Sequence, residues 1–157
     1  MKKLTSALFL SLICISSFTG CGASAKADYE SPKAVIEASN AIHTEWENNQ
    51  LYDDLEGKTF KVKTNEALDN SNAAAETGAD KKTDKSAKGK LDDHKWVCIP
   101  YSDIETEVML WLTDEQYAEM KYKKGDTLVL EVSFIAQRGT KDGKLRQYYI
   151  NAILPEE

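Results

Sequence analysis

Apolar residues between Val35 and Trp46 recur at the spacing of one face of an α-helix. Ser31-Pro32 precedes this pattern, and Ser is a common N-cap while Pro is favoured at the first helical position. We therefore expect a helix over about residues 32–50. Its apolar stripe must pack against another part of the fold, because burial of such side chains is favourable.

Five later segments alternate apolar and polar residues, which is the pattern of β-strands with one buried face. They span about 59–64, 96–101, 108–112, 128–137 and 145–154. In the fourth strand, one face is expected to carry Leu128, Leu130, Val132, Phe134 and Ala136. Lys124-Gly125-Asp126 predicts the turn before this strand, and residues 139–143 predict a hairpin loop after it.

Thr113 and Gln116 have the spacing of a capping box, which predicts a short helix through Met120. Five strands with a helix between the third and the fourth follow the order of an OB-fold, a small five-stranded Greek-key barrel. We therefore expect a mainly β protein, an OB-fold barrel with an N-terminal helix. An open α+β sandwich, with the first helix on one face of the sheet, is the alternative.

Residues 69–94 interrupt the strand pattern. They contain Leu91 as their one large aliphatic residue and no aromatic residue before His94, and they are rich in Ala, Lys, Asp, Ser and Asn. Such a composition buries too little apolar surface to offset the entropy lost on ordering. We expect a mobile, low-complexity insertion between the first and second strands.

The first 20 residues have the pattern of a lipoprotein signal peptide. Lys2 and Lys3 precede an uncharged apolar run over 7–18, which is too short for a membrane-spanning helix. Small residues then lead to Cys21, as in a lipobox, where the peptidase cuts before the cysteine and the thiol carries diacylglycerol.

This pattern predicts removal of residues 1–20, a tether over 21–30 and a domain over 31–157. A lipid on Cys21 would anchor the mature chain to a bacterial membrane, outside the cytoplasm, without spanning it. An ordinary secretory signal followed by an incidental cysteine is the alternative.

Length and charge narrow the expected partners. The chain has 157 residues, which favours one domain. Removal of residues 1–20 takes away Lys2 and Lys3, so 20 basic residues become 18 against 26 acidic ones, and the net charge changes from −6 to −8. We expect no nucleic-acid partner, since general binding to phosphates requires excess positive charge. Cys98 alone would remain as a thiol.

Short motifs lie at the boundaries of the expected elements. They are Asn48-Asn49 leading to Tyr52, Leu55-Glu56-Gly57-Lys58, Lys124-Gly125-Asp126, and Ile150-Asn151-Ala152-Ile153. On these motifs, residues 35–154 resemble the tRNA-anti-like family of bacterial OB-fold proteins, many of which are lipoproteins. The resemblance implies the fold and no particular activity. Two departures from the family pattern are the 69–94 insertion and Thr64-Asn65, which stand where a mid-strand Gly is expected.

Large side chains are expected on the outer face of the second and third strands. If Val97 and Leu110 point into the barrel, then Trp96, Met109 and Trp111 point outward, on the usual ligand face of an OB barrel. These three are candidate ligand-binding residues, and Lys61 and Lys63 of the first strand add positive charge. Such a surface fits a sugar, a peptide or a base. Alternatively, Ile42 and Trp46 of the first helix cover it.

Motifs for catalysis and metal binding are weak in this chain. His43 and Glu47 lie four residues apart, and Asp92-Asp93-His94 are adjacent, but neither set supplies a full ligand shell. We predict no catalytic residue, no metal and no cofactor, and hence no enzyme. The expected function is a non-catalytic binding module whose ligand the sequence does not name; a small molecule, a glycan and an envelope protein are the candidate partners. The alternative is a structural or assembly subunit that docks another envelope protein.

Overall fold

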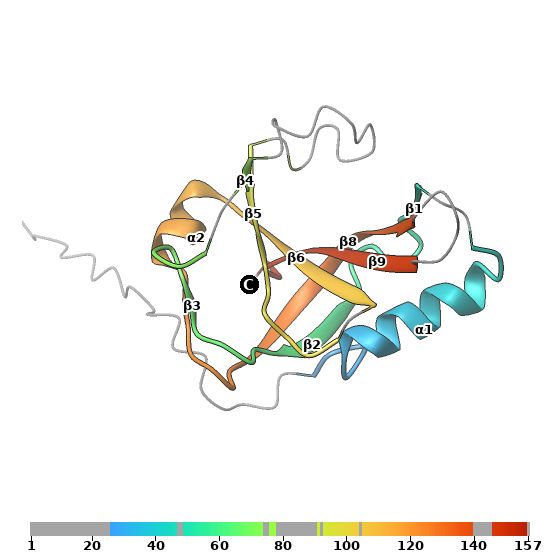
Figure 1. Cartoon of the computed structure of the whole chain (residues 1–157), viewed down its shortest axis with the longest axis horizontal. Coiled ribbons are helices and arrows are strands. Elements are labelled where there is room, and N and C mark those ends of the chain that lie inside the picture. The colour runs from blue at the N-terminus through green and yellow to red at the C-terminus, as the bar shows by residue number, and fades with distance from the viewer. Residues whose placement is uncertain are drawn as a thin grey trace, which may run out of the picture.

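The computed structural model is mainly β, with one mixed sheet of seven strands, a small two-stranded sheet and few helices (Figure 1). It describes residues 26–46, 49–73, 76–77, 91, 93–103, 105–139 and 146–156. The predicted signal peptide, Cys21 and most of the predicted insertion lie outside these ranges. Within them, no helix has the length and apolar character needed to cross a membrane.

The helices and strands follow one another closely along the chain. In order they are α1 (Pro32–Ile42), β1 (Gln50–Tyr52), β2 (Thr59–Lys63), β3 (Leu68–Asp69), β4 (Glu76–Thr77), β5 (Lys95–Cys98), β6 (Thr106–Leu112), α2 (Asp114–Glu119), β7 (Lys121–Tyr122), β8 (Thr127–Gly139) and β9 (Arg146–Ile153).

The large sheet has the strand order β1-β8-β9-β6-β5-β4, and β2 also pairs with β8. β6 and β9 pair in parallel, whereas the other pairs are antiparallel. β8 is the longest strand, and one of its edges pairs first with β2 and then with β1. In the described part of the chain no ladder joins β2 to β5, although Asn65 N donates to Pro100 O at 2.8 Å just beyond their ends.

The core lies between the inward faces of the strands and beneath α1. Its fully buried members include Phe60, Val97, Leu110, Leu130 and Ile150. α1 contacts β2 and β6 and contributes its own buried side chains to the same cluster. The helix therefore covers the apolar interior of the sheet, as its amphipathic pattern requires.

α1 ends at Ile42, so the predicted helix over 32–50 is too long. The His43 ring stacks on Tyr52 with 3.7 Å between ring centroids, and His43 Nε2 lies 2.6 Å from Asp54 Oδ2. These contacts turn the chain toward β1, and Asn49 takes a left-handed backbone conformation with φ 61° just before that strand. Trp46 therefore lies beyond the end of α1 and is not part of the apolar helix face on which we predicted it.

A β-bulge in β8 changes which side chains face the core. The register with β9 shifts between Val132 and Phe134, and Ile135 then pairs with Ile150 in the core. The prediction that Phe134 and Ala136 share a face with Val132 is wrong beyond this point, because one extra residue reverses the alternation.

Local signals around α2 and β8 are confirmed. Thr113 Oγ1 accepts from Gln116 N at 3.2 Å, and Gln116 Oε1 accepts from Thr113 N at 2.9 Å, which completes the predicted capping box. Gly125 has a φ of 91° in the predicted turn before β8, a conformation that favours glycine.

The ends of the predicted insertion take part in the fold. Asp69 belongs to β3, Glu76–Thr77 pairs with β5, and Leu91 is 5% exposed. Tyr117 of α2 donates its hydroxyl hydrogen to Ala73 O at 3.0 Å. Residues 78–90, where we predict mobility, lie outside the described part of the chain.

Candidate functional site

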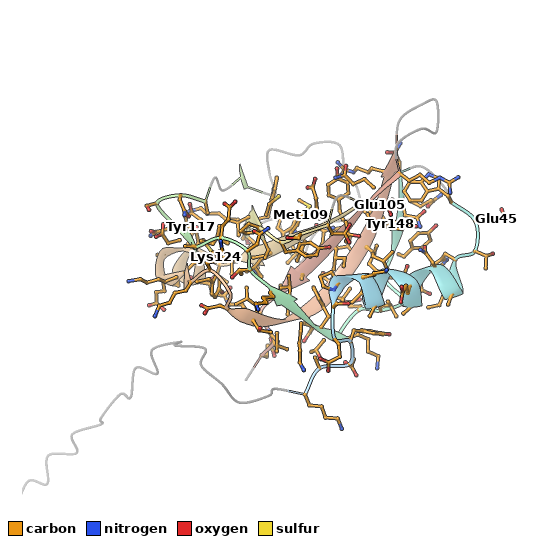
Figure 2. The ribbon with its side chains drawn as sticks, turned by 60° about the horizontal axis from the view of Figure 1, so that its bottom comes forward. Glu45, Glu105, Met109, Tyr117, Lys124 and Tyr148 are labelled. Carbon is orange, nitrogen blue, oxygen red and sulfur yellow. The ribbon has the colours of Figure 1, made fainter. Side chains whose placement is uncertain are left out.

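The predicted aromatic face lies on β5 and β6, on the side of the sheet away from the core. The register pairs Trp96 with Trp111 and Cys98 with Met109, so these four side chains share one face. Figure 2 labels Met109 on this part of the sheet. Val97 and Leu110 belong to the core cluster and these four residues do not, so their predicted outward direction agrees with the structure.

Two of the three candidate residues on this face are buried, a point that the sequence left open. Trp111 is 3% exposed and Met109 is 5% exposed, while Trp96 is half-buried. Trp111 Nε1 donates to Asn151 Oδ1 at 2.8 Å, and the Trp96 and Trp111 rings lie 6.4 Å apart between centroids. Neighbouring side chains on β5 and β9 thus occupy the surfaces that a ligand would need for stacking.

The expectation that Ile42 and Trp46 of the first helix bury this face is wrong. Ile42 is 51% exposed. Trp46 meets the Tyr148 ring edge-on, with 5.2 Å between centroids, and the Arg146 guanidinium lies 5.5 Å from the centre of the Trp46 ring. Trp46 therefore packs at the start of β9 and away from Trp111.

A polar network occupies the same outer face beyond Met109. Gln147 Nε2 donates to Glu107 Oε1 at 2.6 Å, and the Tyr149 hydroxyl donates to Gln147 Oε1 at 2.8 Å. Cys98 Sγ lies 3.9 Å from Glu107 Oε2, a weak contact. Burial first, and the nearby Glu107 carboxylate second, raise the pKa of Tyr149. These polar groups form hydrogen bonds with one another, which indicates a structural role for the network.

A different feature, an open groove of about 1050 Å³, runs beside β2. Four lysines line it, namely Lys33, Lys61, Lys63 and Lys124, together with the acidic residues Glu30 and Asp103. The groove brings together the start of α1, the outer face of β2, the loop after β5 and the turn before β8.

Backbone hydrogen bonds around Thr64 hold two walls of the groove in place. Thr64 N donates to Asp126 O at 2.9 Å, Gly125 N donates to Thr64 O at 2.8 Å, and Thr64 Oγ1 donates to Lys123 O at 2.8 Å. This clasp fixes the turn that carries Lys124 beside the end of β2. Thr64, where the family pattern led us to expect glycine, is 1% exposed and supplies a hydroxyl that glycine lacks.

The lysines of the groove differ in how far they are neutralised. Lys61 Nζ donates to both carboxylate oxygens of Glu30, at 2.9 and 3.0 Å. Lys63 and Lys124 are exposed. The charge that is open to a ligand therefore lies mainly toward the β7–β8 turn, where Figure 2 labels Lys124.

The predicted ligand set is divided between two surfaces. Lys61 and Lys63 lie in the groove on β2, while Trp96, Met109 and Trp111 lie on β5 and β6. In the strand order β8 and β9 lie between β2 and β6. Lys33, Lys124 and Asp103 join the groove but were not predicted. The sequence indicates a turn at Lys124-Gly125-Asp126 but does not indicate that Lys124 lies near Lys63. That proximity depends on the pairing of β2 with β8.

Residues that we assigned to the tether belong to the fold. Tyr29 bridges Phe60, and Asp28 Oδ2 accepts from Thr59 N at 2.9 Å. The Thr59 backbone hydrogen bond lowers the pKa of Asp28. Asp28 and Tyr29 therefore belong to the domain, which we expected to begin at residue 31.

Possible metal ligands are few in the described part of the chain, where no group of three His, Cys, Asp or Glu side chains gathers around one point. His43 bonds Asp54, whose pKa this hydrogen bond lowers, while Glu47 lies outside the described residues. Asp92 of the second candidate set also lies outside them.

Comparison with known proteins identified no relative of this chain. No protein-family model, no curated protein and no solved structure matches the chain.

Proposed function

We propose that the mature protein is a lipid-anchored, extracytoplasmic OB-fold domain that acts as a non-catalytic binding module. In this proposal residues 1–20 are the signal peptide, Cys21 carries the lipid, and the groove beside β2 is the binding surface. The motif resemblance to the tRNA-anti-like family remains part of the proposal and names no ligand.

The strand connectivity supports the OB-fold assignment. If β2, β5, β6, β8 and β9 are the five barrel strands, α2 falls between the third and fourth of them. Their neighbours then follow the order 1-4-5-3-2, with the third and fifth strands parallel. This order places strands 1 and 2 at the two edges, where a barrel closes, and Asn65 N–Pro100 O lies at that seam.

The groove is the observation that carries the binding role. Four lysines face two acidic residues there, in a mature chain whose net charge would be −8. A local excess of positive charge in an acidic chain favours an anionic ligand, because charges beyond about 8 Å are screened at physiological salt. By contrast, Met109 and Trp111 on the outer face of β5 and β6 are buried by packing against their neighbours.

Lipidation is tested by labelling the full chain in a bacterium with radioactive palmitate. The wild type should incorporate label and partition into detergent, and Cys21→Ser should do neither. Cys98→Ser is the matched control, since Cys98 lies on β5, and it should label like the wild type. Equal labelling of Cys21→Ser and the wild type would contradict the anchoring.

Docking of another envelope protein is the second candidate function. The observation in its favour is Ile42, which is 51% exposed at the end of α1. A single exposed apolar side chain is common on soluble proteins, so we prefer the groove. A photocrosslinking residue at position 42 that captures one defined envelope protein in cells, where position 63 captures none, would reverse this preference.

A further inference from the structure

Residues 28–30 determine where the proposed tether leaves the domain. Tyr29 N donates to Thr59 O at 3.0 Å, and Lys61 N donates to Tyr29 O at 3.0 Å, so this segment lies along β2. Glu30, the last residue of this segment, and Lys33, three residues later, line the groove. Residues 28–30 therefore lie beside β2, ahead of the start of α1 (Figure 1), and they place the domain end of the tether at the rim of the groove.

The tether is short, which limits how far the groove can lie from the membrane. Asp28 is seven residue steps beyond Cys21, and an extended chain spans at most about 3.6 Å per step, or roughly 25 Å in all. A lipid on Cys21 therefore holds the rim of the groove within roughly 25 Å of the membrane surface. This step rests on the proposed lipidation.

The groove differs in charge from the rest of the mature chain. Lys61 is paired with Glu30 and the exposed Lys33 lies 3.9 Å from Glu37 Oε1, whereas Lys63 and Lys124 are exposed. The acidic residues elsewhere in the chain account for the net charge of −8, and screening weakens their effect on a surface in contact with the groove. The groove at which the tether begins thus carries more basic than acidic side chains, four lysines against Glu30 and Asp103.

We propose that the groove docks on the anionic phospholipid headgroups of the membrane that holds the lipid anchor. The ammonium groups of Lys63 and Lys124 would lie against headgroup phosphates, with Lys33 at the rim beside the tether. Each basic residue near an anionic bilayer strengthens association by about fivefold. The anchor already keeps the domain beside the surface, so this weak attraction is sufficient to orient it.

Lysine reactivity in reconstituted lipoprotein tests the proposal. The full lipidated chain is placed in vesicles of phosphatidylglycerol or of phosphatidylcholine and acetylated with a water-soluble ester, and each lysine is followed by mass spectrometry. Lys63 and Lys124 should react about fivefold more slowly in phosphatidylglycerol. Lys121, which is exposed but does not line the groove, should keep its rate. High salt should abolish the difference.

Two variants matched in charge separate docking from general attraction. Lys63→Gln should weaken the protection of Lys33 and Lys124, whereas Arg146→Gln, which removes one charge outside the groove, should leave it intact. Soluble glycerol phosphate added to phosphatidylcholine vesicles should protect neither lysine. Protection by this soluble phosphate, equal protection of Lys121, or equal behaviour of the two variants would overturn membrane docking.

Flotation of the same samples reports on the anchor separately. A chain that floats with both kinds of vesicle, but whose Lys63 rate is the same in each, contradicts docking and leaves the proposed lipidation standing. A chain that does not float with phosphatidylcholine contradicts the lipidation, and it also removes the membrane that docking requires.

Discussion

The outer face of β5 and β6 and the groove beside β2 illustrate two uses of surface side chains. On the outer face, Trp111 is buried and donates its indole hydrogen to Asn151. In the groove, backbone bonds around Thr64 hold the walls and leave Lys63 and Lys124 exposed. The comparison shows that large aromatic side chains can stabilise the outside of a sheet, while the groups open to a partner lie elsewhere.

Replacing Trp111 with Ala should give the largest effect on stability. Truncation of a buried large side chain typically lowers the free energy of unfolding by roughly 3–5 kcal/mol, and it also leaves Asn151 Oδ1 without its indole donor. Urea unfolding followed by circular dichroism measures this loss. Trp96→Ala is the matched control, and it should cost clearly less because Trp96 is half-buried. Equal, small losses would mean that the outer face is a free surface.

Gly125→Ala should have an intermediate effect on the groove side. The φ of 91° at Gly125 is unfavourable for any residue with a Cβ, which costs about 1–2 kcal/mol in the left-handed region. The added Cβ would lie 4.0 Å from the Lys63 Cε atom, so no clash is expected and the loss should come from the backbone. Urea midpoints measure it. A loss as large as that of Trp111→Ala would show that the clasp at Thr64 also fails.

Sequence patterns predicted local features better than exposure. The capping box at Thr113 and the turn at Gly125 depend on a few neighbouring residues, and both are present in the structure. Alternation also gave the outward direction of Met109 and Trp111. Their burial depends on which side chains of β9 lie beside them, and a parallel pairing between β6 and β9 is not visible in either strand alone.

Errors in the predicted fold arise at points where one residue changes the local geometry. The bulge after Val132 reverses the faces of β8, and the contacts of His43 with Tyr52 and Asp54 end α1 early. We identified no sequence pattern that predicts the bulge or the early end of the helix. The groove was missed for a related reason, since its lysines come from four segments that only the folded chain brings together.

Asp28→Asn should cause a small, pH-dependent loss of stability at the tether end of the groove. The Thr59 backbone hydrogen bond lowers the pKa of Asp28 in the folded state below its ordinary value of 3.8. The stability that the ionised Asp28 contributes is therefore fully present above pH 3.8, and it is lost as the pH falls through the folded-state pKa. Urea midpoints of the wild type and Asp28→Asn should differ at pH 6 and converge toward pH 3.

Thr59→Ala is the control for this pH dependence, because it removes the hydroxyl donor and keeps the backbone donor of the same residue. It should retain most of the difference between pH 6 and pH 3. A midpoint difference between the wild type and Asp28→Asn that stays constant across this range would show that the carboxylate charge does not matter.

The last prediction concerns nucleic acid, for which we expect no measurable binding at physiological salt. Binding of single strands combines a basic groove with stacking rings, and the tryptophans predicted for stacking, Trp96 and Trp111, lie outside the groove, whose lining includes Tyr101 as its aromatic residue. Trp111 and Met109 are buried, and the exposed charge of the groove comes mainly from Lys63 and Lys124. A free oligonucleotide also lacks the anchor that holds the groove beside a membrane, so a few lysines must supply all of its affinity.

Fluorescence anisotropy with labelled tRNA and single-stranded oligonucleotides tests this expectation, with the complete mature chain carrying Cys21→Ser. A flat titration at physiological salt is the expected result. Saturable micromolar binding that weakens with salt and in Lys63→Gln would assign the groove to nucleic acid. Binding that weakens instead in Trp96→Ala, the half-buried ring, would restore the outer face as a ligand surface and reverse the contrast between the two regions.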